Sequence, residues 1–320
     1  MKKCILTIVI LISGFILKGF AQEKPDNTNN PGVIALTAVV PEQAENLPDI
    51  GKSILKNKLQ QIATINGLGA GMLNQRFIIT SNISIMTKDI VAGPPQQIAQ
   101  NIEATFYIAD YIDKKVFSNI TLELQGVGTN DNKAYIDAIK NIKPANEKFK
   151  NFIASGKNKI IEYYNNQCDI IINTANSLAG MKRYDEAIYN LTMIPDACRE
   201  CYNKSLVAIK PIYQAFLDQK CNENIAKANA AWAASQNSHG AYEAGQFLSQ
   251  IYPDAKCYNE AQQLFKEIKA KVLDDWKFEM KKYNDSVSLE SQRIQSYRDI
   301  GVAYGNHQQP INYHVNWLVR

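Results

Sequence analysis

Two cysteines separated by two residues offer the clearest reactive chemistry in this sequence. Cys198-Arg199-Glu200-Cys201 has the spacing of a thiol–disulfide redox pair, in which a cysteine at the start of a helix has a lowered pKa and is a better nucleophile. However, the pair follows a segment of helical periodicity, whereas redox pairs of this spacing lie next to a βαβ unit. We therefore predict structural cysteines here and keep a thiol–disulfide role for Cys198 and Cys201 as an alternative.

Two glycine-rich segments resemble nucleotide-binding loops, and each departs from the required pattern. Gly51-Lys52-Ser53 has the end of a phosphate-binding loop, but Asn46 stands where its first glycine is needed. Gly67, Gly69 and Gly71 lack the last glycine of a dinucleotide-binding loop and connect a predicted helix to a predicted strand, the reverse of the required order. We interpret them as a turn in which glycine adopts a positive φ, and we expect no small-molecule cofactor.

The three histidines, His239, His307 and His314, offer no metal site, because none lies three or four residues from another ligand on a predicted helix. The motifs of serine hydrolases and zinc proteases are also missing. We therefore expect no catalytic residue, no cofactor-binding residue and no metal, and we predict that the protein is not an enzyme. An exported enzyme with scattered catalytic residues is the alternative.

The first 21 residues have the layout of a cleaved signal peptide. Met1-Lys2-Lys3 is basic, residues 5–17 form an apolar run, and Gly19-Phe20-Ala21 places small residues before Gln22. Cleavage between Ala21 and Gln22 predicts a periplasmic or secreted protein. Cys4 precedes the apolar run, so it is no lipid acceptor, and later association with the envelope would be peripheral.

The charge of the mature chain excludes one class of partner. Lys2, Lys3 and Lys18 leave with the signal peptide, so the 35 basic residues fall to 32, against 31 acidic residues. A nearly neutral chain has no electrostatic attraction for polyanions, and we expect no nucleic-acid partner.

The first half predicts an α+β domain over residues 33–145, after a polar, flexible tail at 22–32. The hydrophobic pattern indicates strands at 33–40, 76–91, 103–112 and 116–125 and helices at 49–65 and 130–142, in the order β-α-β-β-β-α. This order is typical of one sheet covered by two helices. We expect the two halves of the chain to fold separately, with a junction between Pro144 and Phe149.

The second half has helical periodicity almost throughout, in two copies over residues 146–258. Cys168 and Cys221 match at an offset of 53 residues, and Cys201 and Cys257 at an offset of 56. Residues 259–320 predict one long or twice-broken helix, which includes Trp276 and Met280 at helical spacing, and a C-terminal tail with a strand at 311–319.

The repeat also restricts which of the five cysteines of the mature chain can pair. Because five is an odd number, at least one thiol stays unpaired. Cys201 and Cys221 cannot pair if they share one helix, because 20 residues span about 30 Å and a disulfide needs Cα atoms within about 7 Å. Within each copy, the chain runs up one helix and down the next, so its second cysteine returns beside its first. We therefore predict Cys168–Cys201 and Cys221–Cys257, with Cys198 free or exchanging with Cys201.

Two resemblances to known families accompany this pattern. Tyr184 to Ile188, followed by Leu191 and Ile194, resembles the second helix of a tetratricopeptide repeat. Residues 106–125, Gly126-Val127-Gly128 and the following helix with Ala134 and Ala138 resemble the α/β module of the curli-assembly outer-membrane lipoproteins and of the TolB amino-terminal domain. The second resemblance implies an adaptor of the periplasm or outer membrane, but it does not imply a secretion channel.

These observations together predict an exported, non-catalytic binding or scaffold protein. A helical-repeat domain presents an extended concave surface, which we expect to receive a protein or peptide partner in envelope assembly or secretion. A surface-exposed or secreted structural component is a further alternative.

Overall fold

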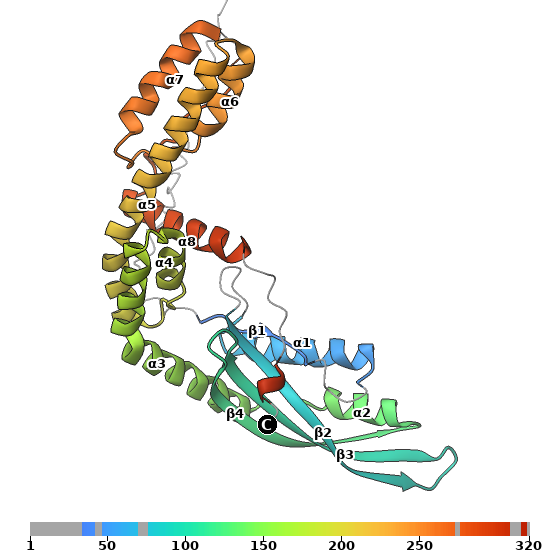
Figure 1. The fold of residues 1–320 in the computed structure, drawn as a ribbon. Coiled ribbons are helices and arrows are strands. Elements are labelled where there is room, and N and C mark those ends of the chain that lie inside the picture. Colours follow the sequence, from blue (N-terminus) through green and yellow to red (C-terminus); the bar gives the residue numbers. More distant parts are fainter. Residues whose placement is uncertain (1–33, 42–46, 70–75, 273–275, 308–314, 319–320) are drawn as a thin grey trace, which may run out of the picture. The chain divides into compact units, whose positions relative to one another are not determined.

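The computed structural model describes residues 34–41, 47–69, 76–272, 276–307 and 315–318. The predicted signal peptide and tail, Cys4 and His314 lie outside these residues. The first half contains β1 (Thr37–Ala38), α1 (Asp49–Ile65), β2 (Phe77–Val91), β3 (Gln97–Asp110), β4 (Lys115–Gly128) and α2 (Asp131–Lys140) (Figure 1). The predicted α+β class and the order β-α-β-β-β-α are confirmed.

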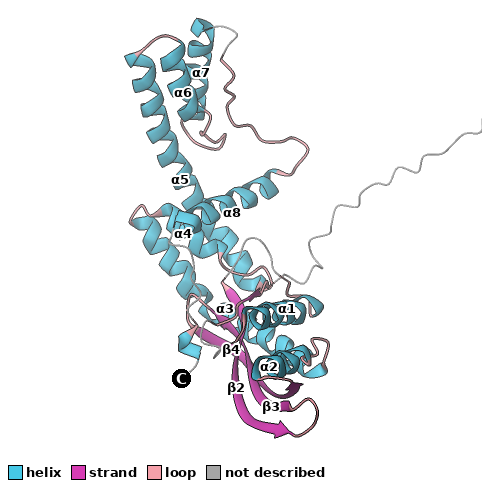
Figure 2. Cartoon of the chain, turned by 90° about the vertical axis from the view of Figure 1, so that its right-hand side faces the viewer, coloured by secondary structure: helices cyan, strands magenta, loops and turns pink. Residues whose placement is uncertain are grey.

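The sheet has the strand order β1-β2-β3-β4, with β1 parallel to β2 and the other neighbours antiparallel. Helices α1 and α2 lie on the same face of this sheet (Figure 2). Phe77 and Ile79 of β2 belong to the core beneath the helices, whereas Ile78 packs with Val315 in a small cluster on the other face. This alternation is the period-2 pattern of a strand that is covered on both sides.

Helix α2 lies unusually close to β4, and two glycines allow this approach. A Cβ atom on Gly126 would lie 2.1 Å from the backbone oxygen of Ala134 and 2.3 Å from the backbone nitrogen of Ala138. A Cβ atom on Gly128 would lie 2.4 Å from the nitrogen of Ala134. The pairing of Gly126-Val127-Gly128 with a helix carrying two alanines is therefore a packing requirement, because no larger side chain fits between strand and helix.

Helix α3 (Glu147–Gly180) continues the cover of the sheet beyond the predicted domain boundary. The ring of Phe149 packs edge-on against Phe106 of β3, with centroids 4.9 Å apart, and Tyr164 packs in the same way against Phe77 of β2 at 5.9 Å. Both α3 residues are almost fully buried. The contacts of the sheet therefore extend about as far as Tyr164, and we expect a first half that folds by itself to include α3 to that point, instead of ending between Pro144 and Phe149.

This packing predicts different behaviour for two fragments. A fragment of residues 33–145 exposes Phe77 and Phe106, and we expect it to be unfolded, since loss of large buried rings costs about 3–5 kcal/mol each. A fragment of residues 33–167 keeps Phe149 and Tyr164 and should fold. Circular dichroism and proton NMR dispersion measure the difference, and a well-folded 33–145 fragment would show that α3 is dispensable for the sheet.

The second half consists of helices joined by short turns. After α3 come α4 (Tyr184–Thr192), α5 (Arg199–Ala234), α6 (Ser238–Leu248) and α7 (Tyr258–Val272) (Figure 1). Helix α5 is continuous over 36 residues, so its first part closes the first predicted copy and its second part begins the second copy. None of the described helices is long and apolar enough to cross a lipid bilayer.

The C-terminal segment differs from the predicted helix. Helix α7 ends at Val272 and α8 begins at Leu289, and residues 276–284 between them are not helical. Trp276 and Met280 are buried nonetheless, and the indole N–H of Trp276 donates to the backbone oxygen of Ala241 at 2.9 Å. A four-residue spacing fits both a helix and an extended chain of period 2, which is why the helical interpretation was wrong here.

Helix α8 ends at His307, and the last described residues, Asn316–Leu318, form a 3₁₀ turn. The strand predicted at 311–319 is therefore wrong for these three residues, and its first part lies outside the described residues. Val315, just before the turn, is buried against Ile78.

Candidate functional site

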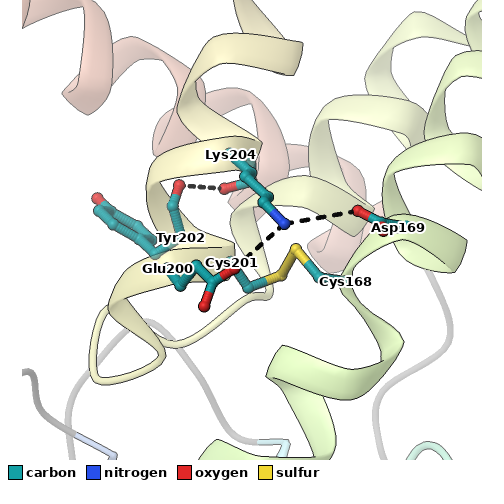
Figure 3. The surroundings of a disulfide bond; sticks show 7 residues. Cys168, Asp169, Glu200, Cys201, Tyr202 and Lys204 are labelled. Atoms are coloured by element: carbon teal, nitrogen blue, oxygen red, sulfur yellow. Dashed lines mark hydrogen bonds and ion pairs between the residues drawn. A yellow bond between two sulfur atoms is a disulfide. The ribbon is translucent and has the colours of Figure 1, made fainter.

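The structure contains two disulfide bonds, Cys168–Cys201 and Cys221–Cys257, with Cα atoms 5.4 and 6.0 Å apart. They join the same cysteines that the repeat argument pairs, and Cys201 and Cys221 both lie on α5. The first bond connects α3 to the start of α5, and the Lys204 ammonium group lies beside it within 3.8 Å of an Asp169 carboxylate oxygen (Figure 3). Disulfide bonds form and persist in oxidising compartments, so they are typical of an exported protein.

Cys198 is a free thiol, and its surroundings oppose a redox role. The side chain is fully buried at the residue before α5. Burial, together with the nearby negative charge of Asp196, raises the pKa of the Cys198 thiol to about 12. The thiol is therefore protonated near neutral pH, and a protonated thiol is a poor nucleophile toward Cys201 or toward a substrate disulfide.

This environment predicts a large difference in thiol reactivity between folded and unfolded protein. Without reductant, we expect iodoacetamide to leave Cys198 unmodified near neutral pH and to alkylate it readily in denaturant, because only unfolding exposes the thiol and restores its ordinary pKa. Mass spectrometry of the alkylated peptides gives the readout. Rapid alkylation of the folded protein would instead support the thiol–disulfide alternative.

The other motifs considered for chemistry have structural roles. Gly51 lies in the first turn of α1 and is buried against Leu47, so this glycine has a packing role in the helix. Gly67 has a φ of 76°, as expected for the turn after α1. His239 and His307 are exposed. Within the described residues, no group of three or more histidine, cysteine, aspartate or glutamate side chains could hold a metal ion.

A buried ion pair connects the sheet to α3. The Asp110 carboxylate, which is 0% exposed, accepts from Arg76 Nε at 2.5 Å and from the Tyr164 hydroxyl at 3.4 Å. Its other oxygen accepts the backbone N–H groups of Ile112 and Asp113 at 2.9 and 3.0 Å. Burial raises the pKa of Asp110 above its ordinary value, and the Arg76 guanidinium opposes this rise. Both oxygens are fully engaged within the fold, so this cluster is structural.

A cavity of about 400 Å³ lies beside β4, where the strand has no neighbour strand. Leu122, Leu124, Ile142 and Phe149 supply its apolar lining. The polar part of the lining consists of Thr121, Glu123, Asn141, Lys143, Asn146 and Lys148. The cavity thus combines an apolar lining, two lysines, one glutamate and an open strand edge.

Helix α2 covers only one end of the β4 edge. The Asp137 carboxylate accepts the backbone N–H of Val127 at 3.1 Å, and the Asn141 amide donates to the backbone oxygen of Gln125 at 2.8 Å. These two side chains occupy the places that a further strand would take. The edge beside the cavity, at Thr121 and Glu123, receives no such hydrogen bond from the described residues. An uncovered edge of this kind can pair with another chain.

Sequence reasoning missed this site because its parts belong to different elements: β4, the α2–α3 connection and the start of α3. Leu122 and Leu124 alternate with exposed residues as in any half-buried strand, and Lys143 and Lys148 lie in a turn and at a helix start. Only the contact of the α2–α3 connection with β4 brings them together.

No family model matches this chain, and no curated protein matches it. Among solved structures, the chain is similar to a minor lipoprotein from Acinetobacter baumannii, with 13% sequence identity and a TM-score of 0.26. The match covers 39% of this chain and 94% of the lipoprotein. A likeness at this level shows neither a family nor a function.

Proposed function

We propose that this chain is an exported, non-catalytic binding protein of the periplasm or outer-membrane face that receives a protein or peptide partner. The observation that carries the proposal is the uncovered edge of β4 beside an apolar cavity with two lysines. Free backbone groups at a strand edge and an apolar cavity beside them are suited to recognising a polypeptide, through main-chain hydrogen bonds and side-chain pockets.

In this proposal, the disulfide-linked helices support the binding site and do not form it. The sequence alone favours the helical repeats as the contact surface, but the cavity lies at the sheet edge and the connection into α3. We therefore keep the predicted class of partner and place its contact on the α+β half. The helices hold α3 in place, because the Cys168–Cys201 bond fixes α3 to α5.

Photo-cross-linking in the cells that export the protein tests the proposal. A photoreactive residue replaces Thr121, which is exposed beside the cavity, and the matched control replaces Asn166, which is exposed on α3. We expect a discrete cross-linked protein from position 121 in the periplasmic or outer-membrane fraction and none from position 166. A cross-link from position 166 alone would move the contact to the helices, and none from either position would contradict a stable protein partner.

A further inference from the structure

We infer that the β4 edge binds its partner by strand addition, and that the added segment carries an apolar and an acidic side chain two residues apart. This inference rests on the proposed function and specifies the kind of polypeptide that the site takes. It depends on three features of the described residues: the direction of the backbone groups of β4, the apolar lining of the cavity and the charge at its rim.

The hydrogen bonds from α2 establish which backbone groups of β4 point away from β3. The Val127 N–H and the Gln125 oxygen reach Asp137 and Asn141, so residues 125 and 127 direct their backbone groups outward. The pairing of β4 with β3 is continuous from Ser118 to Gly128, without a bulge. Backbone direction alternates with period 2 along a strand, so Thr121 and Glu123 also direct their N–H and C=O groups outward.

An added strand would continue the pairing that α2 begins. Main-chain hydrogen bonds to Thr121 and Glu123 supply affinity without sequence preference, and alternate side chains of the added strand supply specificity. One set of these side chains would enter the cavity over Leu122, Ile142 and Phe149. The other set would lie on the opposite face of the sheet, beside the exposed side chains of Thr121 and Glu123.

The positive charge of two lysines at the cavity determines which second side chain of the added strand is favoured on the cavity face. Lys143 and Lys148 are exposed, line the cavity and form no ion pair within the described part of the chain. An acidic side chain two positions from the apolar one lies on the same face of the added strand and meets these lysines. A second copy of this chain would bring two such lysine pairs toward each other on that face, so charge complementarity favours an acidic segment of another protein.

A random peptide library displayed on phage, selected against the mature chain of residues 22–320 with its disulfides intact, supplies the probe. We expect the enriched peptides to share an apolar and an acidic residue at alternate positions. Synthetic forms of these peptides are then titrated against variants by fluorescence anisotropy. Enrichment of peptides without this pattern would overturn the inferred specificity.

The decisive comparison is between Glu123→Pro and Glu123→Ala. Proline removes the outward N–H and leaves the β3 ladder intact, whereas alanine removes only the side chain. We expect Glu123→Pro to bind the peptide about tenfold or more weakly than Glu123→Ala does, since both variants lose the carboxylate and only proline also loses a directed main-chain hydrogen bond. Equal affinities of the two variants would exclude strand addition, even if cross-linking from Thr121 identifies a partner.

A second comparison uses two double variants that change only charge, so it does not depend on whether β4 tolerates a proline. Lys143→Glu/Lys148→Glu should weaken binding about tenfold or more, because it places like charges beside the acidic residue of the peptide. Lys150→Glu/Lys159→Glu makes the same change of net charge on exposed α3 residues outside the cavity and should have little effect. An equal loss of peptide affinity in both double variants would show that the attraction is non-specific, and it would contradict binding at this cavity. A wild-type dimer that Glu123→Pro converts to a monomer would overturn the inference in favour of pairing between copies.

Discussion

Replacing Arg76 with methionine is expected to destabilise the protein by about 3–5 kcal/mol, because the change leaves a buried carboxylate without its counter-charge. Asp110 has no exposed surface, and Arg76 Nε lies 2.5 Å from its Oδ2 atom. Methionine keeps much of the apolar volume of the arginine stem, so the loss reports mainly on charge. Urea unfolding with the disulfides intact measures the difference in free energy.

The pH dependence of this defect distinguishes a charge effect from a packing effect. Burial already raises the pKa of Asp110, and loss of the Arg76 guanidinium removes the main opposing influence. A carboxyl whose folded pKa is raised stabilises the fold below its unfolded pKa of about 3.9, and this stabilisation is lost as the pH rises through the folded pKa. The defect of Arg76→Met should therefore be largest at neutral pH and shrink toward pH 4.

Asp113→Asn is the matched control for this prediction. Asp113 also pairs with Arg76, but its side chain is 37% exposed. An exposed pair contributes less than about 1 kcal/mol, so the control should unfold close to the wild type. A pH-independent defect in Arg76→Met, or an equal defect in Asp113→Asn, would contradict the importance of the buried pair.

Replacing Gly126 with alanine is expected to cost about 3 kcal/mol, the upper part of the range for overpacked cores. The new methyl group would meet the backbone of α2 at 2.1 and 2.3 Å, and backbone atoms cannot move aside as the end of a flexible side chain can. Helix α2 must shift away from β4, which also weakens the hydrogen bonds of Asp137 and Asn141 to the strand edge.

Gly180→Ala is the control for added volume. Gly180 ends α3, and a Cβ atom there has no neighbour within 4 Å. Alanine favours a helix over glycine by up to about 1 kcal/mol, so this variant should be as stable as the wild type or slightly more stable. Thermal and urea unfolding of the two variants give the comparison, and an unchanged midpoint in Gly126→Ala would show that α2 adapts to the methyl group.

The sequence by itself determined the elements and their order, because these depend on local periodicity. The alternation of β2 and the i, i+3, i+4 spacing of α1 lie within single elements, and each was predicted within a few residues of its observed bounds. The cysteine pairs were also accessible, since two copies at similar offsets and the rise of a helix restrict which cysteines can meet. The error at Trp276 and Met280 arose where one spacing fits two periods.

Only the tertiary structure decided the features that join distant segments. Arg76 and Tyr164 meet Asp110 from 34 and 54 residues away. The cavity at β4 depends on the course of the α2–α3 connection, and the open edge at Thr121 and Glu123 depends on where α2 stops covering the strand. No local pattern encodes these contacts, because they follow from the packing of side chains that belong to different elements.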